Sequence, residues 1–391
     1  MTRLNLKSKI HKAVSIALIS AGFIPASHAA ETNVNINNPT GTTITDDPTA
    51  VILNNGQSFT VDNDGTISGA AAVDNGFGIN AFNTTTITNL TNTGDISGTA
   101  GNNTGRGILL QTFSTITTLT NSGTITGTAG ASSGRGISLR TNSEITTLTN
   151  DGTISAATTG NTSRGIGVRT SSTIGTLTNN GTISGTATTG DVGHGIFLLD
   201  DSEITNLTNT GDISATATTG NTARGIRLAR TASITNLTND GTISASAGGT
   251  DGTGVIVDTN STLTTLTNSG TISGTAGNDT GQGISLVTSS TITNLTNDGT
   301  ISGTAGNDTG QGITISVNSE ITNLTNSGTI SGTAVADVGG GFLISDNSTL
   351  GTLTNRGTIS GSAVNDNGSG IRLFRSSTIT TLTNTGTISA T

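Results

Sequence analysis

The chain has 391 residues, a formal net charge of −9, 56 glycines, three prolines and no cysteine, tryptophan or tyrosine. Aromatic residues make up 2% and charged residues 10% of the chain, while Thr, Ser and Asn fill most of the remainder. This composition excludes a disulfide-stabilised domain and a core built on large aromatic side chains, and leaves either a disordered chain or a stack of thin repeated layers.

The N-terminal segment has the pattern of a secretory signal peptide. A basic start with Arg3 and three lysines is followed by an apolar run from Ala13 to Pro25 and by a small-residue stretch that ends at Ala29. This pattern predicts cleavage after Ala29, removal of residues 1–29 and export through the inner membrane. The apolar run is too short for a bilayer-spanning helix, and no later stretch is continuously apolar.

The rest of the chain is acidic. It contains no Lys and has 11 Arg against 24 Asp and Glu, which gives a net charge near −13. A nucleic-acid-binding protein needs a basic surface, so we expect no nucleic-acid partner. The absence of cysteine suits a chain that crosses membranes unfolded, and it is also ordinary for exported bacterial proteins.

The remainder is a tandem repeat. A Gly-Thr-Ile or Gly-Asp-Ile tripeptide recurs twelve times, from Gly65 to Gly386, and its glycine returns every 29 residues apart from two intervals of 30. In the unit that begins at Leu119, this tripeptide is followed by a small polar loop, by Gly136-Ile-Ser-Leu and by Glu144-Ile-Thr-Thr-Leu. The strict register argues against disorder.

Three apolar columns run through the repeat. Ile follows each Gly-Thr or Gly-Asp pair, Leu precedes Thr-Asn in eleven units, and Ile or Leu fills the third column. The two-residue spacing of Ile137 and Leu139 puts both side chains on one face of a strand. A unit of two or three short strands cannot bury that face alone, so the units must stack. The sequence predicts an all-β, right-handed parallel β-helix of about twelve 29-residue repeats, a rod roughly 50–55 Å long.

The chain therefore divides into three parts. We expect a signal peptide at residues 1–29, an N-terminal cap or partial repeat at residues 30–62, and β-helix repeats over residues 63–391, which end inside a repeat. A helical solenoid is excluded because each unit has at least two glycines and lacks the Ala, Leu, Glu and Lys pattern of helices.

Asparagine occurs two residues before the repeated glycine in every unit. We expect these side chains to stack as an internal ladder whose amides bond turn backbone above and below, with a separate Asx-turn in each unit as the alternative. Between Asn150 and Ile154, Gly152 is expected to supply the positive φ of a sharp turn. The ladder residues are Asn92, Asn121, Asn150, Asn179, Asn209, Asn239, Asn268, Asn297, Asn326, Asn355 and Asn384.

Every change in repeat length falls in one loop, between the repeated glycine and the next Gly-Ile-type pair. This interval is 13 residues in nine units and 14 in two, whereas the return interval is always 16. A loop that absorbs insertions projects from the rod, so this edge is either a partner-binding surface or a line of solvated spacer turns.

Arginine occurs just beyond this loop in several early units, and Gln282 and Gln311 take its place later. Stacked like charges repel one another modestly unless they are paired, and neighbouring acidic loops are candidates to neutralise them. The row is interpreted either as a site for sulfated or sialylated glycans or as a solvated face. The candidate partner-binding residues are Arg106, Arg135, Arg164 and Arg224.

Residues for catalysis and metal binding are scarce. His194 is the only histidine after the signal segment, which argues against Ser-His-Asp, Cys-His and zinc sites. The sequence from Asp62 to Gly65 begins like a calcium loop but lacks the later Glu and the flanking helices. We expect no enzymatic activity, no cofactor and no metal.

A signal peptide, the absence of Cys and stacked units of the type Leu-Thr-Asn-x-Gly-Thr-Ile-Ser together resemble the passenger domains of the autotransporter (type V secretion) family. The resemblance covers residues 30–391 and implies a secreted or surface-displayed adhesin at the bacterial cell surface or outer membrane, with a role in cell adhesion, self-association or biofilm formation. Its partners would be a host-cell or matrix surface, or a second copy of itself.

The chain departs from that family in one respect. The family's C-terminal barrel, which would tie the rod to the outer membrane, is not present in this chain. We therefore expect a fragment, a truncated reading frame or a passenger secreted by another route.

Two other functions fit the repeat. Thr-Ile-Thr and Thr-Ile-Ser recur in columns and predict ranks of outward hydroxyls, as on an ice-binding β-helix. Asp95 and Asp212 interrupt one rank, and Glu144, Glu203 and Glu320 interrupt the other. The remaining alternative is an inert stalk for a functional domain outside the chain.

Overall fold

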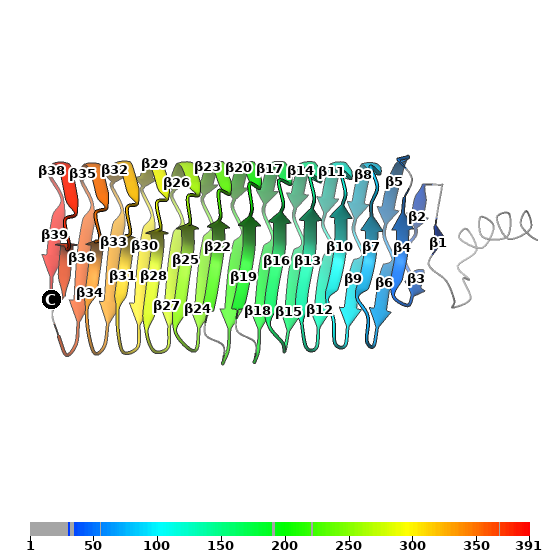
Figure 1. Cartoon of the computed structure of the whole chain (residues 1–391), viewed down its shortest axis with the longest axis horizontal. Helices are drawn as coiled ribbons and strands as arrows, with labels where there is room; N and C mark the ends of the chain where they lie inside the picture. Colours follow the sequence, from blue (N-terminus) through cyan, green and yellow to red (C-terminus); the bar gives the residue numbers. More distant parts are fainter. Residues whose placement is uncertain (1–29, 32–34, 55, 190–191, 220–221, 367) are drawn as a thin grey trace, which may run out of the picture.

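The computed structural model describes residues 30–31, 35–54, 56–189, 192–219, 222–366 and 368–391, so the expected signal peptide lies outside the described residues. The described part folds into three parallel sheets of 13 strands each, which we call sheets A, B and C. Successive strands enter the three sheets in turn, and each coil of chain stacks on the one before it (Figure 1). The predicted parallel β-helix of about 29 residues per coil is confirmed.

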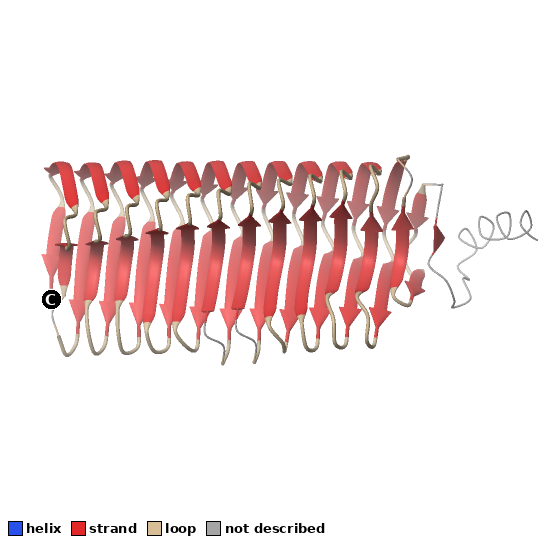
Figure 2. Ribbon diagram, viewed as in Figure 1, coloured by secondary structure: helices blue, strands red, loops and turns tan. Residues whose placement is uncertain are grey.

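The strands are the only regular elements of the described chain (Figure 2). The described residues include no helix with the length and apolarity needed to cross a membrane.

Each sheet takes every third strand in chain order. Sheet A consists of β1 (Ala30–Glu31), β4 (Thr49–Leu53), β7 (Gly76–Ala81), β10 (Gly105–Gln111), β13 (Ser133–Arg140), β16 (Thr162–Arg169), β19 (Val192–Leu199), β22 (Thr222–Ala229), β25 (Asp251–Asp258), β28 (Thr280–Val287), β31 (Gly310–Ile315), β34 (Gly339–Ile344) and β37 (Ser369–Leu373). Sheet B consists of β2 (Ile36–Asn38), β5 (Ser58–Asn63), β8 (Thr86–Asn92), β11 (Thr115–Asn121), β14 (Glu144–Asn150), β17 (Thr173–Asn179), β20 (Glu203–Asn209), β23 (Ser233–Asn239), β26 (Thr262–Asn268), β29 (Thr291–Asn297), β32 (Glu320–Asn326), β35 (Thr349–Asn355) and β38 (Thr378–Asn384). Sheet C consists of β3 (Thr43–Asp46), β6 (Thr66–Ala71), β9 (Asp95–Ala100), β12 (Thr124–Ala129), β15 (Thr153–Thr158), β18 (Thr182–Ala187), β21 (Asp212–Ala217), β24 (Thr242–Ala247), β27 (Thr271–Ala276), β30 (Thr300–Ala305), β33 (Thr329–Ala334), β36 (Thr358–Ala363) and β39 (Thr387–Ala390).

The region expected to be a cap or partial repeat, residues 30–62, supplies strands β1 to β4 and all of β5 except its last residue, Asn63. These strands join the same three sheets as the later repeats. The coil therefore already exists before the first Gly-Thr-Ile tripeptide at Gly65.

The interior of the rod is filled by the apolar columns seen in the sequence. In the coil from β10 to β12, Ile108 and Leu110 come from sheet A, Ile116 and Leu119 from sheet B, and Ile125 from sheet C, and all five are buried. Each lies in register with its counterpart one coil away. Burying one such side chain stabilises the fold by about 1.5–3 kcal/mol, so a core forms only when many coils stack.

A column of asparagines runs inside the rod beside these apolar columns. Asn121 Nδ2 donates to Asn150 Oδ1 at 2.7 Å and to the carbonyl oxygen of Thr153 at 3.2 Å. The same amide-to-amide bond joins successive coils from Asn38 to Asn384, at 2.6 to 2.8 Å. Each interior amide thus receives its hydrogen bonds from the coils around it, as a buried polar group requires.

The turn between sheets B and C corrects one expectation. Among the described glycines, only Gly41 and Gly56 have positive φ, so the positive φ expected at Gly152 is wrong. A Cβ atom on Gly152 would lie 2.1 Å from the carbonyl oxygen of Gly123 in the preceding coil. Glycine is needed here because successive coils approach too closely for any side chain.

Positive φ occurs instead in the turns between sheets A and B. From Asn83 onwards, each of these turns has two successive non-glycine residues in the left-handed region, such as Thr141 (φ 54°) and Asn142 (φ 56°). A serine follows in most coils, and in several of them its hydroxyl donates to the carbonyl oxygen three residues earlier, as Ser143 Oγ does to Arg140 at 2.7 Å. The sequence analysis missed this turn because no glycine marks it.

The loops that vary in length join sheet C to sheet A and line one long edge of the rod, the lower edge in Figure 1. Beside this edge the two strands pack backbone against backbone. A Cβ on Gly127 would lie 1.8 Å from the carbonyl oxygen of Arg135, and a Cβ on Gly134 would lie 2.3 Å from that of Ala157. This seam has no room for large inward side chains, so large residues at this end of sheet A must point outward.

Candidate functional site

The candidate arginines lie on the outer face of sheet A. Arg106 is flanked by two glycines that face the inside of the rod. A Cβ on Gly105 would lie 1.9 Å from the Thr128 carbonyl oxygen, and a Cβ on Gly107 would lie 2.7 Å from Ile125 Cγ2. Because successive side chains of a strand point to opposite faces, Arg106 points outward.

Strand register brings all four candidate arginines into one column. Arg106 pairs with Arg135, Arg135 pairs with Arg164, and His194 lies between Arg164 and Arg224. We call these five residues the arginine column. The same column continues through Thr253, Gln282 and Gln311, which we call the neutral column.

More side chains join this column than the sequence analysis singled out. Phe197, the next outward residue after His194 on β19, stacks on the His194 ring with 4.9 Å between ring centroids. The Arg164 guanidinium carbon lies 4.6 Å from the Phe197 ring centroid, with Arg169 at 5.3 Å and Arg227 at 5.6 Å. These are cation–π distances. The alternation of inward and outward residues after the Gly-Ile pair is the sequence signal that marks these positions.

The arginine column is not a solvated face. Arg106, Arg135, Arg164 and His194 are only 5%, 6%, 9% and 1% exposed. Neighbouring coils stack on each outward side chain from both sides, and Phe197 covers part of the column. The interpretation of this row as a plain solvated surface is therefore wrong.

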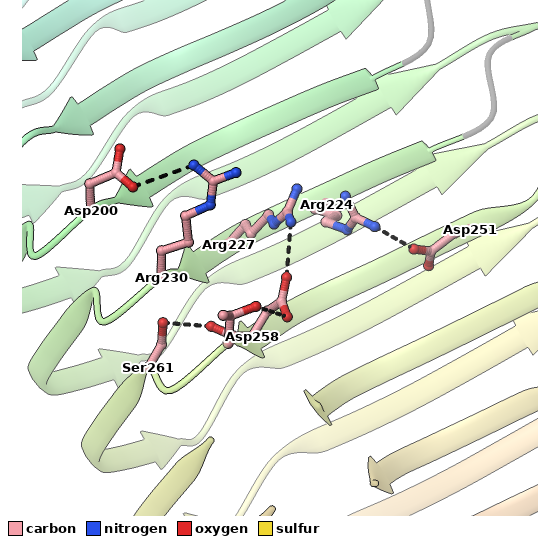
Figure 3. Close-up of polar contacts among 8 residues, drawn as sticks. Asp200, Arg224, Arg227, Arg230, Asp251, Asp258 and Ser261 are labelled. Carbon is pink, nitrogen blue, oxygen red and sulfur yellow. Dashed lines mark hydrogen bonds and ion pairs between the residues drawn. The ribbon is translucent and has the colours of Figure 1, made fainter. Parts of the chain in front are cut away.

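One end of the column has its charge balanced by carboxylates. Arg224 bonds Asp251 at 2.8 Å and Arg227 bonds Asp258 at 2.9 Å, each partner lying on the next strand of sheet A (Figure 3). Arg230 lies 3.6 Å from Asp200 at the exposed margin. These pairs all join adjacent coils.

The other end has no such partners. Within the part of the chain that the structure describes, no carboxylate lies within ion-pair distance of the five arginines at this end of sheet A, which we call the unpaired arginine cluster. Their Nε atoms are buried without a hydrogen-bond partner, as are Nη1 of Arg135 and of Arg164. The cluster consists of Arg106, Arg135, Arg140, Arg164 and Arg169.

Burial and mutual repulsion act on these groups together. Burial lowers the pKa of Arg135 to about 7, with Arg106 and Arg164 adding to the effect. Burial and nearby arginines likewise lower the pKa of Arg164 to about 8 and that of Arg106 to about 9. A guanidinium gives up its proton very reluctantly, so these shifts express a strong preference for a neighbouring negative charge.

The side chains of the cluster limit its chemistry. Arginine carries five N–H donors and no acceptor, so it offers neither a nucleophile nor a base. No group of three or more His, Cys, Asp or Glu side chains suited to a metal ion occurs among the described residues. What the cluster can do is donate hydrogen bonds to an anion.

Comparisons with known proteins assign no family to this rod. The chain matches no protein-family model, no curated protein and no solved structure. A function must therefore be argued from the geometry of the rod and its outer faces.

Proposed function

We propose that this chain is an exported, non-enzymatic structural rod, displayed on the bacterial surface or secreted, that mediates attachment to other surfaces or to copies of itself. The observation that carries the proposal is the contrast between the inside and the outside of the same coils. The inner columns of Ile, Leu and Asn hardly change along the rod, whereas outward positions on sheet A vary from coil to coil.

This contrast separates a scaffold from a display surface. A solenoid needs only its inner columns to fold, so outer residues are free to serve a partner. Where an outward residue recurs in successive coils, as Arg106, Arg135 and Arg164 do, it presents the same group once per coil, which favours multivalent contacts with extended partners. The secretory signal pattern and the resemblance of the repeats to autotransporter passengers support a location outside the cell.

A bead-adhesion assay tests the proposal. Beads coated with the purified chain are expected to attach to cultured epithelial cells, to immobilised matrix proteins or to one another, whereas albumin-coated beads do not. Sedimentation velocity measures self-association of the free chain in parallel. A chain that stays monomeric and attaches to none of these surfaces would rule out the adhesive role.

An ice-binding role is the second candidate because threonine and serine form outward columns on sheets B and C. These columns are interrupted where Asp95 is in register with Thr124 and where Glu144 lies between Thr115 and Thr173. A charged carboxylate holds water in a geometry that does not match a flat hydroxyl lattice. We expect no thermal hysteresis in a freezing-point assay, and a measurable gap between melting and freezing would favour this role over adhesion.

A further inference from the structure

The unpaired arginine cluster is not needed to hold a rod together. The neutral column has the same backbone register with Thr253, Gln282 and Gln311 in place of arginine. Gln282 Nε2 donates to Thr314 Oγ1 at 2.8 Å, so a neutral side chain can find its partner within the fold. The arginines therefore need a reason that lies outside folding.

Their hydrogen-bonding groups indicate what they lack. Five guanidinium groups, three of them more than nine-tenths buried, meet on one face with buried N–H groups and no acceptor among the described residues. Taking such charges out of water is unfavourable unless an opposite charge replaces the solvent. A carboxylate does this for Arg224 at 2.8 Å, but none of the five clustered arginines has a carboxylate within ion-pair distance in the described chain.

We propose that the unpaired arginine cluster binds sulfate-type oxyanions, carried by a sulfated polysaccharide that lies along sheet A. A sulfate group accepts several N–H bonds at once and stays ionised at any physiological pH, which matches a fork of guanidinium donors. The inference deepens the proposed attachment function, and its biological meaning rests on that function.

The arrangement of the cluster favours a polymer over a single ion. Arg106, Arg135 and Arg164 repeat once per coil, about 4.8 Å apart, and form a line of charge rather than one pocket. Arg140 and Arg169, the last residues of β13 and β16, are less buried than this line and so offer accessible donors beside it. The acidic remainder of the chain repels polyanions, so it confines them to this face.

Binding is measured with the full purified chain and fluorescein-labelled dextran sulfate, by fluorescence anisotropy. Unsulfated dextran tests the need for sulfate, and hyaluronan tests whether a carboxylate polymer suffices. Inorganic sulfate is tested separately as a shift in melting temperature against chloride at equal ionic strength, since a ligand that binds the folded state stabilises it. The shift of the double variant described next is subtracted, because sulfate also stabilises folded proteins without binding a site.

The test variant is the double substitution Arg135→Gln and Arg164→Gln. Glutamine already occupies this column at Gln282 and Gln311, so the variant is expected to fold. Arg356→Gln is the control for loss of positive charge away from sheet A, because it removes one charge from the turn between β35 and β36. We expect dextran sulfate to bind the wild-type chain, to bind the double variant at least about tenfold more weakly and to bind the control within about twofold.

The outcomes separate the two proposals. Unchanged dextran sulfate affinity in the double variant overturns the inference, as does equal binding of hyaluronan. A response to inorganic sulfate without any to dextran sulfate overturns the polysaccharide and leaves a free-anion site. If the double variant loses dextran sulfate binding while beads coated with it still adhere, the site is supported and adhesion lies elsewhere on the rod. If the wild-type chain binds dextran sulfate but never adheres, the site is supported and the attachment function is rejected.

Discussion

Two stacked columns of polar side chains run through the same coils, one inside sheet B and one outside sheet A. In the inner column each Asn amide carries both a donor and an acceptor, so Asn121 donates to Asn150 and the ladder satisfies itself. In the outer column Arg106, Arg135 and Arg164 carry donors alone, and stacking like on like leaves every one of them short of an acceptor.

This difference distinguishes a structural repeat from a functional one. A column that closes its own hydrogen bonds can be extended through every coil without outside help, as the asparagines are. A column of like charges has to end, be paired or hold a ligand. All three occur on sheet A: Thr253 follows Arg224 and ends the charge, Asp251 pairs Arg224, and the unpaired arginine cluster is left for a ligand.

The largest effect on stability should come from interrupting the inner asparagine column, whose side chains satisfy one another's hydrogen bonds. Asn179→Asp keeps the size of the side chain but removes its donor, so a buried carboxylate faces Asn209 Oδ1, which Asn179 now bonds at 2.7 Å. An unpaired buried charge lowers the free energy of unfolding by roughly 3–5 kcal/mol, measured by urea denaturation.

The control for this prediction is the next residue. Asn180→Asp makes the same chemical change at an exposed turn position and should have a far smaller effect. Equal losses at both positions would mean that the ladder does not stabilise the rod.

The second prediction concerns the arginine column, where substitution should stabilise the rod instead of destabilising it. In sulfate-free chloride buffer, Arg135→Gln with Arg164→Gln should raise the free energy of unfolding by about 1–3 kcal/mol, because two buried and unpaired charges are removed. Arg224→Gln is the contrast, since it strands the Asp251 carboxylate and should not stabilise the rod. Urea melts of the three chains measure both, and a less stable double variant would contradict the view that these charges are uncompensated.

His194 allows the burial of the arginine column to be tested through the pH dependence of stability. Burial, followed by the charges of Arg164, Arg224, Arg227 and Arg169, holds its pKa well below the ordinary value of 6.5. The unfolded chain takes up a proton below that pH while the folded chain does not, so stability falls as the pH falls below 6.5. The slope is up to about 1.4 kcal/mol per pH unit.

His194→Gln tests this, since glutamine cannot titrate and already occurs in the same column. The pH dependence of wild-type stability minus that of the variant isolates the histidine. If the two profiles run parallel between pH ~5 and ~7, where free histidine titrates, the imidazole is not held neutral.

The smallest effect should come from extending the charge into the neutral column. Gln282→Arg should lower stability by about 1 kcal/mol in chloride, and added sulfate should restore it. Asn294→Arg adds the same charge at an exposed position on sheet B and should show no sulfate dependence. Melting temperatures with and without sulfate measure both variants, and the same response in both would remove the special role of sheet A.

Much of the fold could be predicted because each coil contacts only its neighbours. Once Ile125 and Leu119 recur every 29 residues, parallel stacking is the arrangement that buries them all. The role of Gly152 was predicted wrongly, because a close approach between coils and a left-handed turn both require glycine. The turn at Thr141 and Asn142 was missed because its positive φ is imposed on ordinary polar residues.

The candidate site could be predicted only in part. The sequence placed Arg106, Arg135, Arg164 and Arg224 in one row, but it gave no indication of how buried they are. Phe197 and Arg140 were not foreseen as neighbours, because their contribution depends on which outward columns lie side by side.

The sequence by itself determined the period of the coil, the inner columns and the order of charges along sheet A, since each is a repeat that can be counted along the chain. Only the tertiary structure decided which charges have partners. Arg224 meets Asp251 from the next coil, and Arg164 meets Phe197 from the coil after its own. Pairing and burial are set by side chains a full turn away, and their reach across that spacing depends on rotamers that the order of residues does not specify.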